Sequence, residues 1–129
     1  MTGPATVLVV EDNPLNRKLV RDVLGHAGFR VLESEDAEQG IELARSEQPD
    51  LILMDVQLPG IDGVQALGRL QADAATAAIP VVALTAFAMK DDRERFLAAG
   101  FHAYLEKPIS VTALPGQIAA LIAGREPPA

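Results

Sequence analysis

Five short apolar segments alternate with longer segments of helical periodicity along the chain. The apolar segments are residues 6–10, 29–33, 50–54, 79–84 and 101–105. In the segments between them, apolar residues recur every three or four positions, which is typical of amphipathic helices. The alternation predicts an α/β fold, in which a parallel sheet is covered by five helices on its two faces.

The polarity of the five apolar segments predicts their order in the sheet. Residues 7–10, 51–54 and 81–84 are continuously apolar, as strands buried on both faces are. Polar residues interrupt 29–33 and 101–105, which is typical of edge strands. With right-handed crossovers, this pattern favours a doubly wound, flavodoxin-like sheet in the order 2-1-3-4-5. Ligands of such sheets bind beyond the carboxyl ends of the strands, between strands one and three.

Each predicted helix has an apolar face. Asp12 or Asn13 can cap the first helix, and Pro14 suits its first turn. The alanine-rich stretch 73–78 is predicted to be a solvent-facing loop. The residues expected to share a face are Leu15, Leu19, Val23 and Ala27 in the first helix, Ala37, Ile41 and Ala44 in the second, Val64, Leu67 and Leu70 in the third, Phe96 and Leu97 in the fourth, and Leu114, Ile118, Leu121 and Ile122 in the fifth.

Length and composition restrict the class of protein. A chain of 129 residues suits a single domain, here with a core at about 6–124 and no output domain. Cysteine is absent, no apolar run approaches the ~20 residues of a membrane helix, and no signal-peptide pattern opens the chain. Eighteen acidic against eleven basic residues give a net charge of −7, which argues against nucleic-acid binding. We therefore expect a cytoplasmic protein without membrane insertion.

Charged or hydroxyl residues follow four of the five predicted strands. Glu11 and Asp12 follow strand one, Asp55 follows strand three, Thr85 ends strand four and Lys107 follows strand five. Three neighbouring carboxylates repel one another unless a cation intervenes, and a ligand set made only of oxygens favours a hard ion such as Mg²⁺. The simpler alternative is that Glu11 and Asp12 only favour a helix N-terminus. The third acid, on the next central strand, favours the metal site.

Together, these residues suit the transfer of a phosphoryl group. A metal beside Asp55 can align the group and neutralise charge on its oxygens. Lys107 would add a positive charge and Thr85 a hydroxyl donor, so the predicted product is an aspartyl phosphate. Taken singly, Lys107 could be a solvated loop lysine and Thr85 an ordinary strand residue. Their coincidence at consecutive strand ends favours one joint site.

Four motifs resemble those of the receiver domain of two-component response regulators. They are residues 8–13 (LVVEDN), 53–63 (LMDVQLPGIDG), 84–86 (LTA) and 107–108 (KP). The resemblance covers about residues 6 to 124, and order, spacing and strand placement all match. Stretches 11–18, 79–90 and 107–110 are most similar to stand-alone receivers of the DivK type, followed by receivers attached to hybrid histidine kinases.

The resemblance implies a role for each matching residue at the acidic edge. Asp55 is expected to accept the phosphoryl group. Asp55, Asp12 and the backbone carbonyl of Gln57 are expected to bind Mg²⁺, or Mn²⁺ in its place, and Glu11 to reach the ion mostly through water.

The resemblance also implies how the phosphoryl group is sensed. Thr85 and Lys107 are expected to contact it, and the peptide bond before Pro108 to be cis. Tyr104 is expected to move inward together with Thr85, although it could also be an edge-strand aromatic that only packs.

The implied partners are a histidine kinase or histidine phosphotransfer protein and a downstream protein target. Leu15 on the first helix is a candidate contact for the phosphodonor. Phe87 and Met89, at the start of the fourth helix, are candidates for an output face formed by helix four, strand five and helix five. The alternative for Phe87 and Met89 is a local apolar contact without a partner.

The resemblance implies a signalling switch or shuttle, with a possible role in cell-cycle or polarity control, rather than a turnover enzyme. A phosphatase of the haloacid dehalogenase type needs a second aspartate where this chain has Gln57. Two alternatives stay open: a receiver cut from a hybrid histidine kinase, and a pseudo-receiver that acts only by binding.

Overall fold

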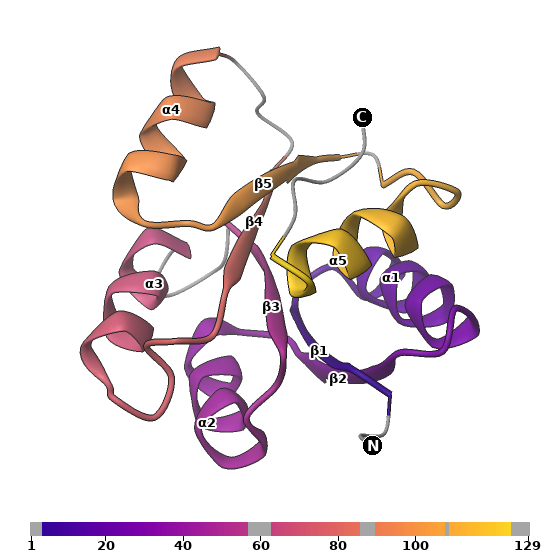
Figure 1. Cartoon of the computed structure of the whole chain (residues 1–129), viewed down its shortest axis with the longest axis horizontal. Coiled ribbons are helices and arrows are strands. Elements are labelled where there is room, and N and C mark those ends of the chain that lie inside the picture. Colours follow the sequence, from indigo (N-terminus) through magenta and orange to yellow (C-terminus); the bar gives the residue numbers. More distant parts are fainter. Residues whose placement is uncertain (1–3, 57–62, 86–89, 108, 125–129) are drawn as a thin grey trace.

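The computed structural model describes residues 4–56, 63–85, 90–107 and 109–124. Strands and helices alternate along these residues (Figure 1), as the sequence predicted. The elements are β1 (Thr6–Val10), α1 (Pro14–His26), β2 (Arg30–Ser34), α2 (Ala37–Glu47), β3 (Leu51–Asp55), α3 (Gly63–Ala72), β4 (Val81–Thr85), α4 (Lys90–Ala99), β5 (Ala103–Glu106) and α5 (Leu114–Ile122).

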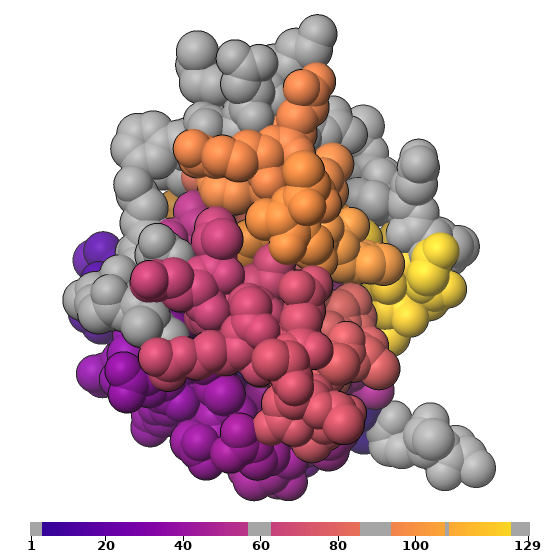
Figure 2. All heavy atoms as spheres, turned by 90° about the vertical axis from the view of Figure 1, so that its left-hand side faces the viewer, coloured from indigo at the N-terminus to yellow at the C-terminus, as the bar shows by residue number. Residues whose placement is uncertain are grey.

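The five strands form one parallel sheet in the order β2-β1-β3-β4-β5, which confirms the predicted order. The sheet is doubly wound, with α1 and α5 on one face and α2, α3 and α4 on the other (Figure 1). Figure 2 shows the molecule from the side of α2, α3 and α4, which follow one another across the surface. Strands β2 and β5 are the edges, as their polar residues indicated.

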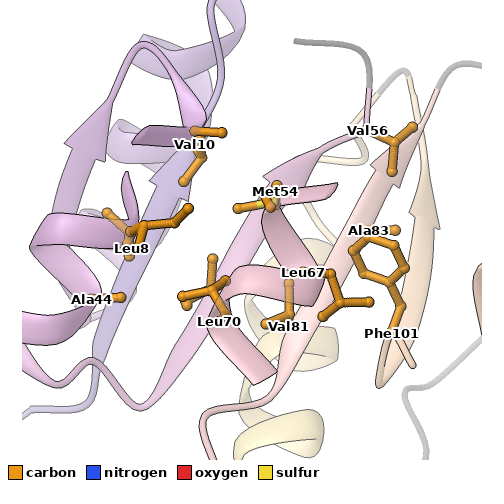
Figure 3. Close-up of a cluster of buried hydrophobic side chains, with 14 of the residues drawn as sticks. Leu8, Val10, Ala44, Met54, Val56, Leu67, Leu70, Val81, Ala83 and Phe101 are labelled. Atoms are coloured by element: carbon orange, nitrogen blue, oxygen red, sulfur yellow. The ribbon is translucent and has the colours of Figure 1, made fainter. Parts of the chain in front are cut away.

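Alternate residues of the central strands point into two separate cores. Leu8, Met54 and Ala83 belong to the core under α2, α3 and α4, which Figure 3 shows together with Leu67 and Phe101. The intervening strand residues face α1 and α5. Because both faces of β1, β3 and β4 are buried, these strands hold the residues at their carboxyl ends in a rigid frame.

Four of the five strands begin and end one or two residues later than the sequence predicted. Strand β3 includes Asp55 and β4 includes Thr85, so both residues are paired in the sheet. Strand β5 extends to Glu106, opposite Thr85. The continuing backbone ladder therefore fixes the positions of the two central candidate site residues.

The buried face of α1 differs from the predicted one. Val20 and Leu24 are fully buried, whereas Leu15 is 77% exposed and Leu19 is 37% exposed. The centre of the predicted stripe was one position, or about 100° of helix rotation, away from the observed one, although its member Val23 packs partly buried against the same core. The Asn13 side chain caps the helix by accepting hydrogen bonds from the backbone N–H groups of Leu15 and Asn16.

Three smaller predictions about exposure were also wrong. Val64 on α3 and Leu97 on α4 are exposed, although their neighbours Leu67 and Phe96 are buried as expected. The stretch 73–78 is not wholly solvent-facing, because Thr76 is buried and its hydroxyl donates to the carbonyl of Leu70 at 2.7 Å.

Within the described residues, no helix has the length and apolar character needed to cross a membrane.

The observed face of α1 can be tested by truncating one leucine on each side of the helix. Leu24→Ala should lower the free energy of unfolding by about 2–5 kcal/mol, because it opens a cavity between α1 and the sheet. Leu15→Ala should change it by less than about 0.5 kcal/mol, because that side chain is exposed. Urea unfolding measures both, and equal losses would contradict the assigned rotation of α1.

Candidate functional site

Three carboxylates meet at the carboxyl edge of the sheet. Glu11 and Asp12 follow β1, and Asp55 ends β3, the strand paired with β1. One carboxylate oxygen from each of the three residues lies within 4.8 Å of the others. Glu11 and Asp55 are buried, whereas Asp12 is exposed. The cluster is therefore a concentrated negative charge that is open to solvent at Asp12.

Lys107 brings a positive charge to the two buried acids. Its ammonium donates a hydrogen bond to Asp55 Oδ2 at 2.9 Å and another to Glu11 Oε1 at 3.4 Å. Its backbone N–H donates to the carbonyl of Thr85 at 2.8 Å, which holds the lysine against the end of β4. The end of β5 is in this way joined to the ends of β1, β3 and β4.

The ionisation of the buried groups reflects this crowding. Burial raises the pKa of Glu11 above its ordinary value of 4.5, and the charge of Asp55 raises it further. Burial alone would lower the pKa of Lys107, but the hydrogen bond to Asp55 and the charges of Asp55 and Glu11 hold it above its ordinary value of 10.5. Lys107 is therefore a fixed positive charge at neutral pH, and burial makes the ionised form of Glu11 costlier than it is in water.

The donor atoms of the cluster fit a divalent cation. Glu11 Oε2 is buried and takes no hydrogen bond, although the Lys107 ammonium lies 3.1 Å away. A buried carboxylate oxygen without a hydrogen bond is costly, and a cation or its bound water would satisfy it. All the donors are oxygens, which suits Mg²⁺ better than Zn²⁺ or copper.

The structure also describes three other residues that were predicted to take part in the function. Thr85 is fully buried at the end of β4, next to Lys107. Tyr104 on β5 is half-buried against the core under α2, α3 and α4, and its hydroxyl donates to Glu106 Oε1 at 3.4 Å. Leu15 is exposed in the first turn of α1. The predicted roles of Gln57, Phe87, Met89 and the peptide bond before Pro108 lie outside the described residues.

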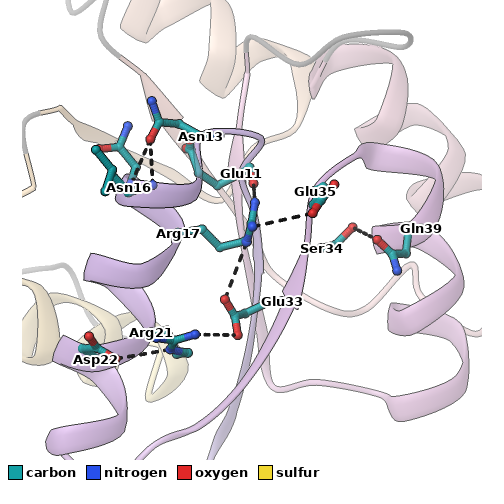
Figure 4. Close-up of polar contacts among 11 residues, drawn as sticks. Glu11, Asn13, Asn16, Arg17, Arg21, Asp22, Glu33, Ser34, Glu35 and Gln39 are labelled. Atoms are coloured by element: carbon teal, nitrogen blue, oxygen red, sulfur yellow. Dashed lines mark hydrogen bonds and ion pairs between the residues drawn. The ribbon is translucent and has the colours of Figure 1, made fainter.

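Arg17 was not predicted from the sequence, but it contacts the cluster through the backbone. Its guanidinium donates a hydrogen bond to the carbonyl of Glu11 at 2.9 Å (Figure 4). The acceptor is a main-chain atom, so no motif of side chains points to this contact. A correct assignment of the buried face of α1 would have placed Arg17 towards the sheet.

The model of the response regulator receiver domain family matches residues 7–119. The chain belongs to this family. It is 46% identical over 108 residues to the polar-differentiation response regulator DivK of Brucella anthropi, an alignment that covers 84% of this chain and 88% of the relative.

Two solved structures are similar to this receiver domain. The receiver domain of a sensor histidine kinase from Pseudomonas aeruginosa, solved with a magnesium ion in its active-site cleft, has a TM-score of 0.85 and 36% identity over 94% of this chain and 99% of that one. The chemotaxis response regulator CheY4 of Vibrio cholerae has a TM-score of 0.80 and 25% identity over 84% of this chain and 91% of that one.

Family membership confirms the resemblance and the flavodoxin-like fold inferred from the sequence. Receiver domains are phosphorylation-dependent switches of two-component systems rather than turnover enzymes. They bind Mg²⁺ in an acidic site, and the cluster of Glu11, Asp12 and Asp55 is compatible with that ion. They interact with histidine kinases and with downstream targets.

The raised pKa of Glu11 predicts how the metal-free receiver responds to pH. The folded state keeps the Glu11 proton to a higher pH than the unfolded chain, so this residue's contribution to stability falls as pH rises above 4.5. Glu11→Gln removes the charge. In EDTA, the variant should therefore melt higher than the wild type at neutral pH, and the difference should shrink as pH falls towards 4.5 and stay small below it.

The control for this prediction is Mg²⁺, which should raise the melting temperature of the wild type more than that of Glu11→Gln. A variant that melts lower than the wild type at neutral pH in EDTA would contradict the prediction. That result would mean that Lys107 already compensates the buried charge of Glu11.

Proposed function

We propose that Asp55 accepts a phosphoryl group from a histidine kinase or a histidine phosphotransfer protein in a Mg²⁺-dependent step. The observation that carries this proposal is the contact of 2.9 Å between the Lys107 ammonium and Asp55 Oδ2 inside the cluster of three carboxylates. Asp55 ends a fully buried strand, so its carboxylate is held at a rigid edge of the sheet. A rigid acceptor with a neighbouring cation favours in-line attack.

The transfer exchanges one bond to phosphorus for another. A carboxylate oxygen of Asp55 attacks, the P–N bond to the donor histidine breaks, and the electron pair returns to the imidazole. The product is an acyl phosphate on Asp55, with charge spread over three phosphoryl oxygens. Lys107 faces these oxygens as a fixed positive charge, and the hydroxyl of Thr85 donates a hydrogen bond to one of them.

Asp12, Asp55 and the backbone carbonyl of Gln57 would hold the metal, with Glu11 acting mostly through water. When bound, Mg²⁺, or Mn²⁺ in its place, neutralises phosphoryl charge. The exposed carboxylate of Asp12 leaves the cluster accessible from solvent, which suits a reversible ion that keeps part of its water shell.

The output follows from the new charge at Asp55, about −1.5 to −2. Thr85 turns towards the phosphoryl group, and Tyr104 on the neighbouring strand moves inward and leaves its hydroxyl contact with Glu106. This movement changes the face formed by α4, β5 and α5. We expect Phe87 and Met89 to contact a downstream target.

The phosphodonor docks against α1 beside the site. Leu15 is a strongly exposed leucine in the first turn of this helix, near the acidic residues that follow β1. The similarity to DivK supports a switch or shuttle in cell-cycle or polarity control. A receiver domain of a hybrid histidine kinase is the second candidate, supported by the Pseudomonas aeruginosa structure.

Intact mass after incubation with acetyl phosphate and Mg²⁺ tests the proposal. The wild type should gain one phosphoryl group, and EDTA should abolish the gain. Asp55→Asn should gain no phosphoryl group, because the side-chain amide of asparagine is not a nucleophile at neutral pH. Glu106→Gln is the matched control, because it removes a carboxylate at the same edge of the sheet. This variant should still gain the phosphoryl group.

A gain that persists in Asp55→Asn would place the acceptor elsewhere and contradict the proposal. If the wild type gains no mass from acetyl phosphate or from a histidine kinase, the chain is a pseudo-receiver that acts by binding alone.

A further inference from the structure

Arg17 holds the backbone of the residue that opens the acidic cluster. Its Nη1 donates a hydrogen bond to the carbonyl oxygen of Glu11 at 2.9 Å (Figure 4). The backbone N–H of Glu11 donates to the carbonyl of Ser34 at 3.0 Å. Both main-chain polar atoms of Glu11 therefore have fixed partners, although β1 has already ended at Val10.

The hydrogen bond to Arg17 meets a physical requirement of this position. Glu11 has no exposed surface, and a buried carbonyl needs a hydrogen-bond donor. The carbonyl of Glu11 belongs to the peptide unit that leads into Asp12, so its direction helps to set where the Asp12 carboxylate lies. Rotation of this peptide would move one metal-binding carboxylate relative to the other two.

Arg17 is itself braced by two acids at the end of β2. Its Nε lies 3.6 Å from Glu33 Oε1, and its Nη2 lies 3.7 Å from Glu35 Oε1. The Arg17 side chain is only 16% exposed, so its position is restricted by packing as well as by charge. The guanidinium thus connects α1, the end of β2 and the peptide between Glu11 and Asp12.

We propose that Arg17 is a positioning residue for the metal site: by holding the carbonyl of Glu11, it aims the carboxylates of Glu11 and Asp12 at the ion. The inference rests on the Mg²⁺-dependent function proposed above. Arg17 does not touch the ion, and it acts through the direction of one peptide unit. Partners of this kind, one step removed from the ligands, commonly change metal affinity by about 10- to 100-fold.

Arg21 provides a matched control one turn further along α1. Its Nη1 lies 3.6 Å from Glu33 Oε2, so it shares an acid with Arg17. Arg21 also pairs with Asp22, and among the described residues it makes no hydrogen bond or ion pair with Glu11 (Figure 4). Arg21→Met removes the same charge from the same helix and leaves the Glu11 carbonyl contact intact.

The experiment is a Mg²⁺ titration of the wild type, Arg17→Met and Arg21→Met. Backbone amide chemical shifts, recorded below the melting temperature of each protein, monitor the binding of the ion. We expect the Kd for Mg²⁺ to rise by about tenfold or more in Arg17→Met and to stay within about twofold of the wild type in Arg21→Met. Glu33→Gln, which loosens the brace but keeps Arg17, should raise the Kd more than Arg21→Met does.

Each other outcome has one meaning. An unchanged Kd in Arg17→Met overturns the positioning role, and equal losses in Arg17→Met and Arg21→Met assign the effect to overall charge and overturn it as well. If Arg17→Met does not fold, Glu33→Gln decides, and a Kd equal to that of Arg21→Met overturns the inference. A wild type that does not bind Mg²⁺ would instead refute the proposed function.

Discussion

The pairing of one ammonium with two buried carboxylates is the interaction on which the rest of the site depends. Glu11 and Asp55 are both buried, and burial with mutual repulsion raises the pKa of Glu11. Lys107 offsets part of this repulsion from the end of β5. One positive charge against three carboxylates leaves the cluster negative. The cluster therefore attracts a divalent cation, and with that cation bound it suits a phosphoryl group.

The sheet order makes this arrangement possible. Strands β1 and β3 are neighbours, so Glu11 and Asp55 meet although they are far apart in the chain. Both faces of the central strands are packed, and the ladder continues to Asp55 and Thr85. The charged edge is therefore carried by a rigid apolar frame. The residues that would respond to phosphorylation in the proposed function, Thr85 and Tyr104, lie on the paired strands β4 and β5.

The sequence predicted those features that depend on residue type along a strand. Continuous apolar runs identified the central strands, and the residues after them identified the acidic cluster and Lys107. The sequence did not predict features that depend on the rotation of a helix about its axis or on contacts to main-chain atoms. Leu15 and Leu19 have the spacing of a buried stripe, but the core selects Val20 and Leu24 about 100° away. The contact of Arg17 with the Glu11 carbonyl depends on where α1 lies against β2, which no local pattern specifies.

A crystal structure of the receiver with Mg²⁺ and beryllium fluoride, which mimics an acyl phosphate, would show the proposed phosphorylated site. We expect a trifluoroberyllate group on Asp55, with the Lys107 ammonium and the Thr85 hydroxyl within hydrogen-bond distance of it. The ion should lie against Asp12 and Asp55, on the side of the cluster open to solvent. A trifluoroberyllate group on another side chain, or a Lys107 turned away from the group on Asp55, would contradict the assignment of Asp55 and Lys107.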